Sequence, residues 1–141
     1  MLTITEKSRS AVQALTELAQ RGMASPVPIL EVAESRGIPL HFLEQLFAGL
    51  RRAGILQSQR GVKGGYSFRR PPSDITVLEV VETVDGRLTR APGEDAPQPD
   101  GGGDAVWDDA RQALCSVLAG VTIADIVERE AKMQSAPMFF I

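Results

Sequence analysis

The residues between positions 51 and 70 carry a concentrated positive charge. Six side chains in this stretch are basic and none is acidic. Three glycines follow its midpoint, and glycine permits the positive φ angles and close backbone approach that the tip of a β-ribbon requires. The basic residues are Arg51, Arg52, Arg60, Lys63, Arg69 and Arg70, and the glycines are Gly61, Gly64 and Gly65. A basic, glycine-tipped ribbon is suited to the phosphates of a nucleic acid.

Catalytic and metal chemistry is poorly supported by the residues present. The chain has one histidine, His41, and one cysteine, Cys115, so it holds no His/Cys set with metal-ligand spacing and no nucleophile–base pair. A phosphate-binding loop at residues 61–65 is excluded because no Gly-Lys-Ser/Thr sequence follows. We therefore expect neither an enzyme nor a metal site. We expect Cys115 to be a small buried hydrophobic side chain. The alternative is a thiol sensor near a dimer axis.

A helix precedes the ribbon and would position its base-reading side chains. Its apolar residues recur at i, i+3, i+7 and i+10, which is one helical face. Pro39 suits the first turn and Gly54 the C-terminal cap. A shorter helix over residues 28–36, ended by Gly37, comes before it, and the pair has the spacing of a helix-turn-helix. The apolar face consists of Leu40, Leu43, Phe47 and Leu50.

Two helices followed by a basic ribbon predict a winged helix-turn-helix, in a chain that is mainly α with a small β-ribbon. The N-terminal part of the second helix would reach base edges. Glu44 is suited to accept from cytosine N4, Gln45 to pair with adenine and Phe42 to touch a thymine methyl group. Partial packing under the wing is the alternative for His41 and Phe42, and an ion pair with Arg51 or a wing cation is the alternative for Glu44.

The wing and the first helix supply further predicted DNA contacts. The backbone after Arg60 is glycine-rich, which leaves its side chain room to reach a phosphate or the minor groove. A capping box of Thr3 and Glu6 would start the first helix near residue 4, so Lys7 and Arg9 fall where the helix dipole disfavours cations. A DNA phosphate there would resolve this conflict, and ordinary solvated charges are the equal alternative. The full set is Lys7, Arg9, His41, Phe42, Glu44, Gln45, Arg51, Ser58, Arg60, Gly61, Lys63, Gly64 and Tyr66.

The second half of the chain differs in charge and composition. Residues 1–75 carry ten Lys/Arg and six Asp/Glu, whereas residues 76–141 carry five and twelve, so the halves have net charges of +4 and −7. This asymmetry favours a phosphate-attracting N-terminal face, with two solvated surfaces as the alternative. Residues 86–104 have almost no apolar side chains and predict a flexible loop. The predicted parts are a DNA-binding domain at 1–85, this loop, and a C-terminal helical part at 105–141.

Three further helices are expected around this loop. One follows an N-cap at Asp74 or Thr76, a long amphipathic helix spans residues 106–118, and a last helix follows Thr122. The tail at 137–141 is apolar, so we expect it to pack onto the body or a partner subunit. The broad apolar side of the long helix consists of Trp107, Ala110, Leu114, Val117 and Leu118.

The sequence also indicates a compartment. No apolar run approaches the roughly 18–20 residues of a membrane span. The N-terminus lacks the charged-then-apolar order of a signal peptide. A single cysteine excludes a disulfide framework. We therefore expect a cytoplasmic protein that does not bind membranes.

Two segments are the most distinctive in the chain. Residues 43–54 read LEQLFAGLRRAG and residues 58–66 read SQRGVKGGY. Together with residues 75–80 and 121–127, they resemble the Rrf-type family of bacterial winged-helix transcription regulators. The resemblance implies a homodimer, joined through the helix at 105–119, whose two wings grip a pseudo-palindromic operator. It makes double-stranded DNA and a second copy of the chain the expected partners.

One departure from the family concerns its cofactor. Cluster-binding members carry three cysteines in the loop before the dimerisation helix, and residues 86–104 contain none. Thiolates are the usual ligands of such clusters. We therefore expect a cluster-free regulator with no cofactor, acting as a repressor and answering to a small-molecule or protein effector of unidentified class through this loop. Two alternatives stay open: a winged-helix protein-interaction module, and a redox sensor that uses an unconventional cluster at Asp104 and Cys115 or the Cys115 thiol alone.

Overall fold

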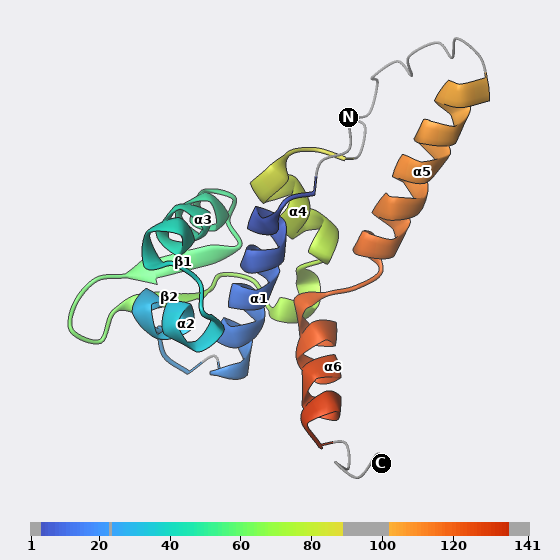
Figure 1. Ribbon diagram of the computed structural model, residues 1–141. Coiled ribbons are helices and arrows are strands. Elements are labelled where there is room, and N and C mark those ends of the chain that lie inside the picture. Colours follow the sequence, from blue (N-terminus) through green and yellow to red (C-terminus); the bar gives the residue numbers. More distant parts are fainter. Residues whose placement is uncertain (1–3, 23, 89–101, 136–141) are drawn as a thin grey trace.

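The computed structural model describes residues 4–22, 24–88 and 102–135, with side chains in the helix at 102–119 described from residue 105. Within these ranges the chain forms six α-helices, one 3-10 helix and a two-stranded antiparallel sheet (Figure 1). The predicted class, mainly α with a small β-ribbon, is confirmed. The elements are α1 (Glu6–Gln20), α2 (Ile29–Arg36), α3 (Leu40–Arg52), β1 (Leu56–Gln59), β2 (Gly65–Phe68), η1 (Pro72–Asp74), α4 (Val77–Asp85), α5 (Gly102–Ala119) and α6 (Ile123–Ser135).

The main core forms where α1, α2, α3 and the base of the ribbon meet (Figure 1). α1 contacts α2, α3, α4 and α6, so it is the central helix of the body. Leu15 and Leu18 of α1 and Phe47 and Leu50 of α3 are at most 1% exposed in this core. Burying a side chain of this size contributes about 1.5–3 kcal/mol, so these contacts fix the angle between the two helices.

The start of α1 differs from the prediction. The helix begins at Glu6 and its N-cap is Thr5, whose Oγ1 accepts a hydrogen bond from the backbone N–H of Lys7 at 3.1 Å. The predicted capping box is therefore wrong; its Thr3 lies outside the described residues. Threonine is as good a cap at position 5 as at position 3, so spacing alone could not choose between them.

Asp85, at the end of α4, ties the start of α1 to α4. Its carboxylate accepts from the Thr5 backbone N–H at 2.9 Å, from Thr5 Oγ1 at 2.7 Å and from Ser8 Oγ at 2.5 Å. Burial raises the pKa of Asp85, but the hydrogen bonds from Ser8 and Thr5 outweigh it and hold this pKa below its usual value. The ionised carboxylate is thus part of the folded structure.

α3 follows the predicted apolar pattern, except that Leu46 is buried in place of Leu40. It begins after Pro39, and the chain turns at Gly54, which has a φ of 81°. Leu43, Phe47 and Leu50 are fully buried as predicted, but Leu40 is 37% exposed because the first residue of the helix lies at the edge of the core. Leu46, one helical turn after Leu43, fills the core instead, with 7% exposure.

The ribbon pairs β1 with β2 from Leu56↔Phe68 to Gln59↔Gly65. An isolated antiparallel bridge between Val27 and Tyr66 joins β2 to the connector before α2, through hydrogen bonds of 2.9 and 2.8 Å. The sequence indicated only stiffness for this connector, because a single bridge leaves no periodic pattern. The bridge attaches the base of the wing to the helix-turn-helix.

α5 lies apart from the main core and packs against α4 (Figure 1). It begins at Gly102, ahead of the predicted start at residue 105, so part of the predicted loop is helical. The start of that loop is also anchored: Leu88 is 5% exposed, its N–H donates to Glu82 Oε2 at 2.7 Å, and its carbonyl accepts from Arg111 at 3.1 Å. The remainder of the loop, at 89–101, and the apolar tail, at 136–141, lie outside the described residues.

Threonine caps begin the last of the helices that pack on the body. Thr76 caps α4 by accepting from the Glu79 N–H, and Thr122 caps α6 by accepting from the Asp125 N–H, each at 3.1 Å. Both caps were predicted, Thr76 as one of two alternatives. Ile123 is fully buried, and the predicted inward residues Ile126 and Val127 are half-buried.

A polar cluster centred on Arg36 joins α1, α2 and α6. Arg36 donates to Glu17 of α1 at 2.9 Å and to Glu130 of α6 at 2.9 Å, with side-chain exposures of 18%, 13% and 29%. Hydrogen bonds from Arg36 and Gln20 keep the pKa of Glu130 below its usual value. Burial raises the pKa of Glu17, but hydrogen bonds from Arg21 and Arg36 reverse the shift and leave it lowered.

Candidate nucleic-acid interface

The outer face of α3 presents polar side chains to solvent near its N-terminus. His41, Glu44 and Gln45 are exposed there, on the side opposite Leu43 and Phe47. Glu44 makes no ion pair with any described residue, so its carboxylate is available as an acceptor, and the alternative of an ion pair with Arg51 or a wing cation is not observed. This arrangement has the acceptors and donors needed to read base edges.

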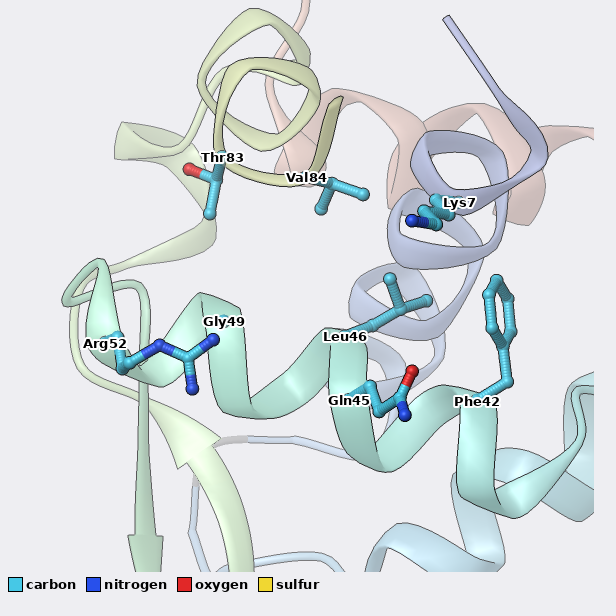
Figure 2. Close-up of a pocket in the computed structure, with 8 residues that line it drawn as sticks. All are labelled: Lys7, Phe42, Gln45, Leu46, Gly49, Arg52, Thr83 and Val84. Carbon is cyan, nitrogen blue, oxygen red and sulfur yellow. The ribbon is translucent and has the colours of Figure 1, made fainter. Parts of the chain in front are cut away.

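Phe42 lies differently from its neighbours on α3. Its ring is half-buried and packs against the main core, rather than under the wing as the alternative had it. Figure 2 shows the ring beside Lys7 and Leu46, at the flank of α3 that faces α1 and α4. Only part of the Phe42 ring is therefore available for the predicted thymine contact.

The tip of the wing is open and basic. Arg60, Gly61 and Lys63 are exposed, and neither cation forms an ion pair with a described residue. Gly64 lets the tip close, because a Cβ at this position would stand 2.2 Å from the Gln59 carbonyl oxygen. Two cations held on a compact loop suit the backbone or the minor groove of DNA.

The base of the wing is attached to α3. Tyr66 packs edge-on against Phe47, with ring centroids 5.0 Å apart and an interplanar angle of 66°. Arg51 Nη1 donates to Ser58 Oγ of β1 at 3.4 Å, and both residues are exposed. The structure therefore places Tyr66 at the base of the wing, where it sets the wing's position relative to α3.

Not all cations of the basic stretch are available. Arg70 forms an ion pair with Glu79 and donates to the Asp74 carbonyl at 2.8 Å. The hydrogen bond to Glu79 raises the pKa of Arg70, so this cation is committed to holding the wing's exit against α4. The sequence alone could not separate Arg70 from its neighbours, because its partner lies nine positions away on a different element.

The two predicted contacts on α1 point in different directions. Lys7 is exposed and lines a cleft beside Gln45 of α3. Arg9 is also exposed, and its guanidinium lies 4.0 Å from Glu6 on the same helix. The structure thus brings Lys7 next to α3, whereas Arg9 lies beside Glu6 on α1.

The predicted dimer-interface residues of α5 fall into two groups. Trp107 is 70% exposed and Val117 is 65% exposed, and Ala110 is exposed with them. Leu114 and Leu118 are half-buried and pack against α4. α5 thus uses one side within the chain and leaves a second apolar side uncovered.

Cys115 lies on the buried side of α5. It is 9% exposed and belongs to the cluster of Val81 and Leu88, as expected for a small hydrophobe. Residues 4–22, 24–88 and 102–135 contain no group of three His, Cys, Asp or Glu side chains able to hold a metal ion. Nor do the helices in these ranges include one long and apolar enough to cross a bilayer.

Comparison with known proteins agrees with this geometry. A model of the Rrf2 family, described as iron-dependent transcriptional regulator, matches residues 4–129. The chain belongs to the Rrf2 family. It is 34% identical to the HTH-type transcriptional regulator IscR of Xenorhabdus nematophila, over 96% of this chain and 85% of that protein. It is 37% identical to IscR of an Escherichia coli strain, over 92% of this chain and 82% of that protein. The predicted family is thus confirmed.

Solved structures of the same family have this fold. The T. potens IscR structure matches with a TM-score of 0.79 and 32% identity, covering 98% of this chain and 95% of that one. The structure of CymR, the global cysteine regulator of B. subtilis, matches with a TM-score of 0.78 and 29% identity, covering 92% and 98%. Members of the family are DNA-binding transcription regulators and not enzymes, so this chain is a regulator that binds DNA.

Proposed function

We propose that this protein is a sequence-specific transcriptional repressor that binds a pseudo-palindromic operator as a homodimer, without an iron–sulfur cluster. The observation that carries this proposal is the joint exposure of Glu44 on α3 and of Arg60 and Lys63 on the wing, all without ion-pair partners among the described residues. The Tyr66–Phe47 contact supports a fixed spacing between helix and wing. A rigid pair of this kind suits one groove and its adjacent backbone.

Affinity and specificity are divided between the two parts. The wing cations contact phosphates or the minor groove and give binding to any duplex. Glu44, Gln45 and His41 contact base edges and give the sequence preference. We propose repression because a dimer bound across a promoter would block access to it without any further partner.

The test compares Arg60→Ala with Glu44→Ala on a panel of duplexes at several salt concentrations. Arg60→Ala should weaken binding to every duplex and reduce the salt slope by about 0.9 for each phosphate that the side chain no longer neutralises. Glu44→Ala should keep the salt slope and relax the preference at one base pair, by about 1–3 kcal/mol. Arg129→Ala, on α6, is the matched control. Equal scaling of all duplexes by both variants would contradict this division.

The uncovered side of α5 supports the dimer. Val106, Trp107 and Val117 are 59%, 70% and 65% exposed, a larger apolar strip than a monomer needs to leave in water. A symmetric pairing of two such helices would cover both strips. It would also set the two recognition helices about one DNA turn apart, roughly 34–36 Å.

The residues present do not fit the iron that the family description mentions. The chain has one cysteine and one histidine. Cys115 lies on α5, buried among apolar residues, and His41 is exposed on α3. Clusters are held by several thiolates, sometimes with histidines. The proposed regulator therefore answers to a different signal from its cluster-binding relatives.

A further inference from the structure

A cleft of about 170 Å³ runs along one flank of the recognition helix. Figure 2 shows α3 forming one wall and α4 the other, with Thr83 and Val84 facing α3 across the gap. Lys7 and Arg52 stand at opposite ends of the cleft. None of its lining residues is acidic, so the cleft has positive ends and no negative charge of its own.

Neither cation forms an ion pair with a described residue. Lys7 and Arg52 are exposed, and neither lies within 4.0 Å of a described carboxylate oxygen. Lys7 interacts electrostatically with the Asp85 carboxylate but forms no ion pair with it, and the oxygens of Asp85 accept hydrogen bonds from Thr5 and Ser8 instead. Two exposed cations without ion pairs on one short cleft attract an anion from outside the chain.

The framework of the cleft is fixed. The Lys7 backbone N–H donates to Thr5, which with Ser8 is bound to Asp85 at the end of α4, so the Lys7 end of the cleft cannot move independently of α4. On the opposite wall, Gly49 has no side chain, and a Cβ there would stand 3.7 Å from Arg52 Nη2. The glycine keeps the middle of the cleft open beside the guanidinium.

The direction of Arg52 differs from that of Arg51. Consecutive residues on a helix point about 100° apart. Arg51 turns towards the wing and donates to Ser58, whereas Arg52 lies beside Gly49 and lines the cleft. A recognition helix in a major groove lies between two walls of phosphates, one from each strand. If the wing contacts one of these walls, a cleft on the opposite flank of α3 would be available to the other.

We propose that this cleft seats a backbone phosphate of the DNA strand opposite the one held by the wing, with Lys7 and Arg52 as its two cations. This inference rests on the proposed function. It assigns a DNA contact to Arg52, gives Lys7 a defined partner, and makes Gly49 the position that keeps the seat open. A phosphate held from two sides would fix how deeply α3 enters the groove.

The first test measures duplex binding at a series of salt concentrations for Lys7→Gln, Arg52→Gln and the double variant. Each single variant should lower the salt slope, and the double variant should lower it by about 0.9 per subunit. Because both cations act on one phosphate, the change in the double variant should be smaller than the sum of the changes in the two single variants. Arg129→Gln on α6 should leave the slope unchanged. Unfolding curves should match the wild type, since both side chains are exposed.

The second test fills the cleft without changing charge. Gly49→Leu favours the helix and places apolar atoms in the seat. It should reduce the salt slope as the double variant does, whereas Gly49→Ala should have a smaller effect. A duplex selected by the wild type is then scanned with neutral methylphosphonates. At one position in each half-site, the methylphosphonate should lower the duplex affinity of the wild type at least tenfold. The same substitution should leave the affinity of the Lys7→Gln/Arg52→Gln variant unchanged.

The outcomes separate this inference from the proposed function. If the wild type shows no salt-dependent duplex binding, the proposed function itself is wrong. If Arg60→Ala changes the slope while the cleft variants do not, the function stands and the phosphate seat is refuted. If inorganic phosphate alone, added without DNA, shifts the amide resonances of Gly49 and Lys7 while duplex does not, the cleft takes a free anion and this inference is overturned.

Discussion

Gly65→Ala should detach the base of the wing from the connector before α2. Gly65 has a φ of +149°, and a Cβ on it would stand 2.2 Å from the Val27 carbonyl oxygen. That oxygen accepts the Tyr66 N–H at 2.8 Å, and the Val27 N–H donates to Tyr66 at 2.9 Å. The methyl group would push apart the two segments that this bridge joins.

The magnitude follows from these contacts. Each of the two hydrogen bonds contributes about 0.5–1.5 kcal/mol. An alanine at positive φ adds about 1–2 kcal/mol. Gly65→Ala should therefore lower the free energy of unfolding by about 2–5 kcal/mol. Gly61→Ala is the matched control, because its φ is +114° but nothing lies within 4 Å of its Cβ, so only the conformational part, about 1–2 kcal/mol, should appear.

Urea unfolding and hydrogen exchange measure these effects. The difference between the two variants isolates the bridge, and the Val27 and Tyr66 amides should exchange at least tenfold faster in Gly65→Ala only. Duplex affinity should fall as the wing moves from its position. Equal destabilisation by both variants, with both amides still protected, would show that the bridge does not hold the wing.

The remaining predictions concern the interface, the cofactor and the α6 anchor. Val117→Asp should yield monomers by sedimentation and weaken operator binding; Leu114→Asp is a poorer test because Leu114 also packs against α4. Anaerobically purified protein should contain substoichiometric iron and sulfide, and a stoichiometric cluster would refute the cluster-free proposal. Arg36→Gln should lower the free energy of unfolding by about 2–3 kcal/mol at neutral pH. Because Arg36 lowers the pKa of Glu130, that stabilisation is present above the usual value near 4.5 and lost as pH falls through the lower folded value, so Arg36→Gln should flatten the acid side of the stability profile.

Local signals in the sequence were sufficient for most of the fold. The three-residue and four-residue spacing of Leu43, Phe47 and Leu50 predicted α3, and the glycines predicted the wing, because both depend on neighbours along the chain. The Thr76 and Thr122 caps were readable for the same reason. Leu46 was missed because the pattern was assigned to one narrow stripe, whereas α3 packs against α1 and α4 as well as α2.

Features that join distant elements were not predictable from one sequence. The Val27–Tyr66 bridge, the Arg36 cluster and the Asp85 anchor each depend on tertiary contacts, between residues up to 94 positions apart in the chain. The same reason explains why Arg70 and Arg52 looked equivalent in the sequence, since each lies in a run of basic residues. The packing of α4 pairs Arg70 with Glu79, whereas Arg52 lines the cleft without an ion pair.

Amide chemical shifts, followed while a duplex is titrated into the protein, would show which surface binds DNA. We expect the shifts to concentrate on the outer face of α3, the wing between β1 and β2, and Lys7, and to diminish as salt is raised. The amide resonances of α6 should not shift, and they serve as the internal control. Shifts confined to α5 and α6, or no shifts at low salt, would contradict DNA binding through the winged helix.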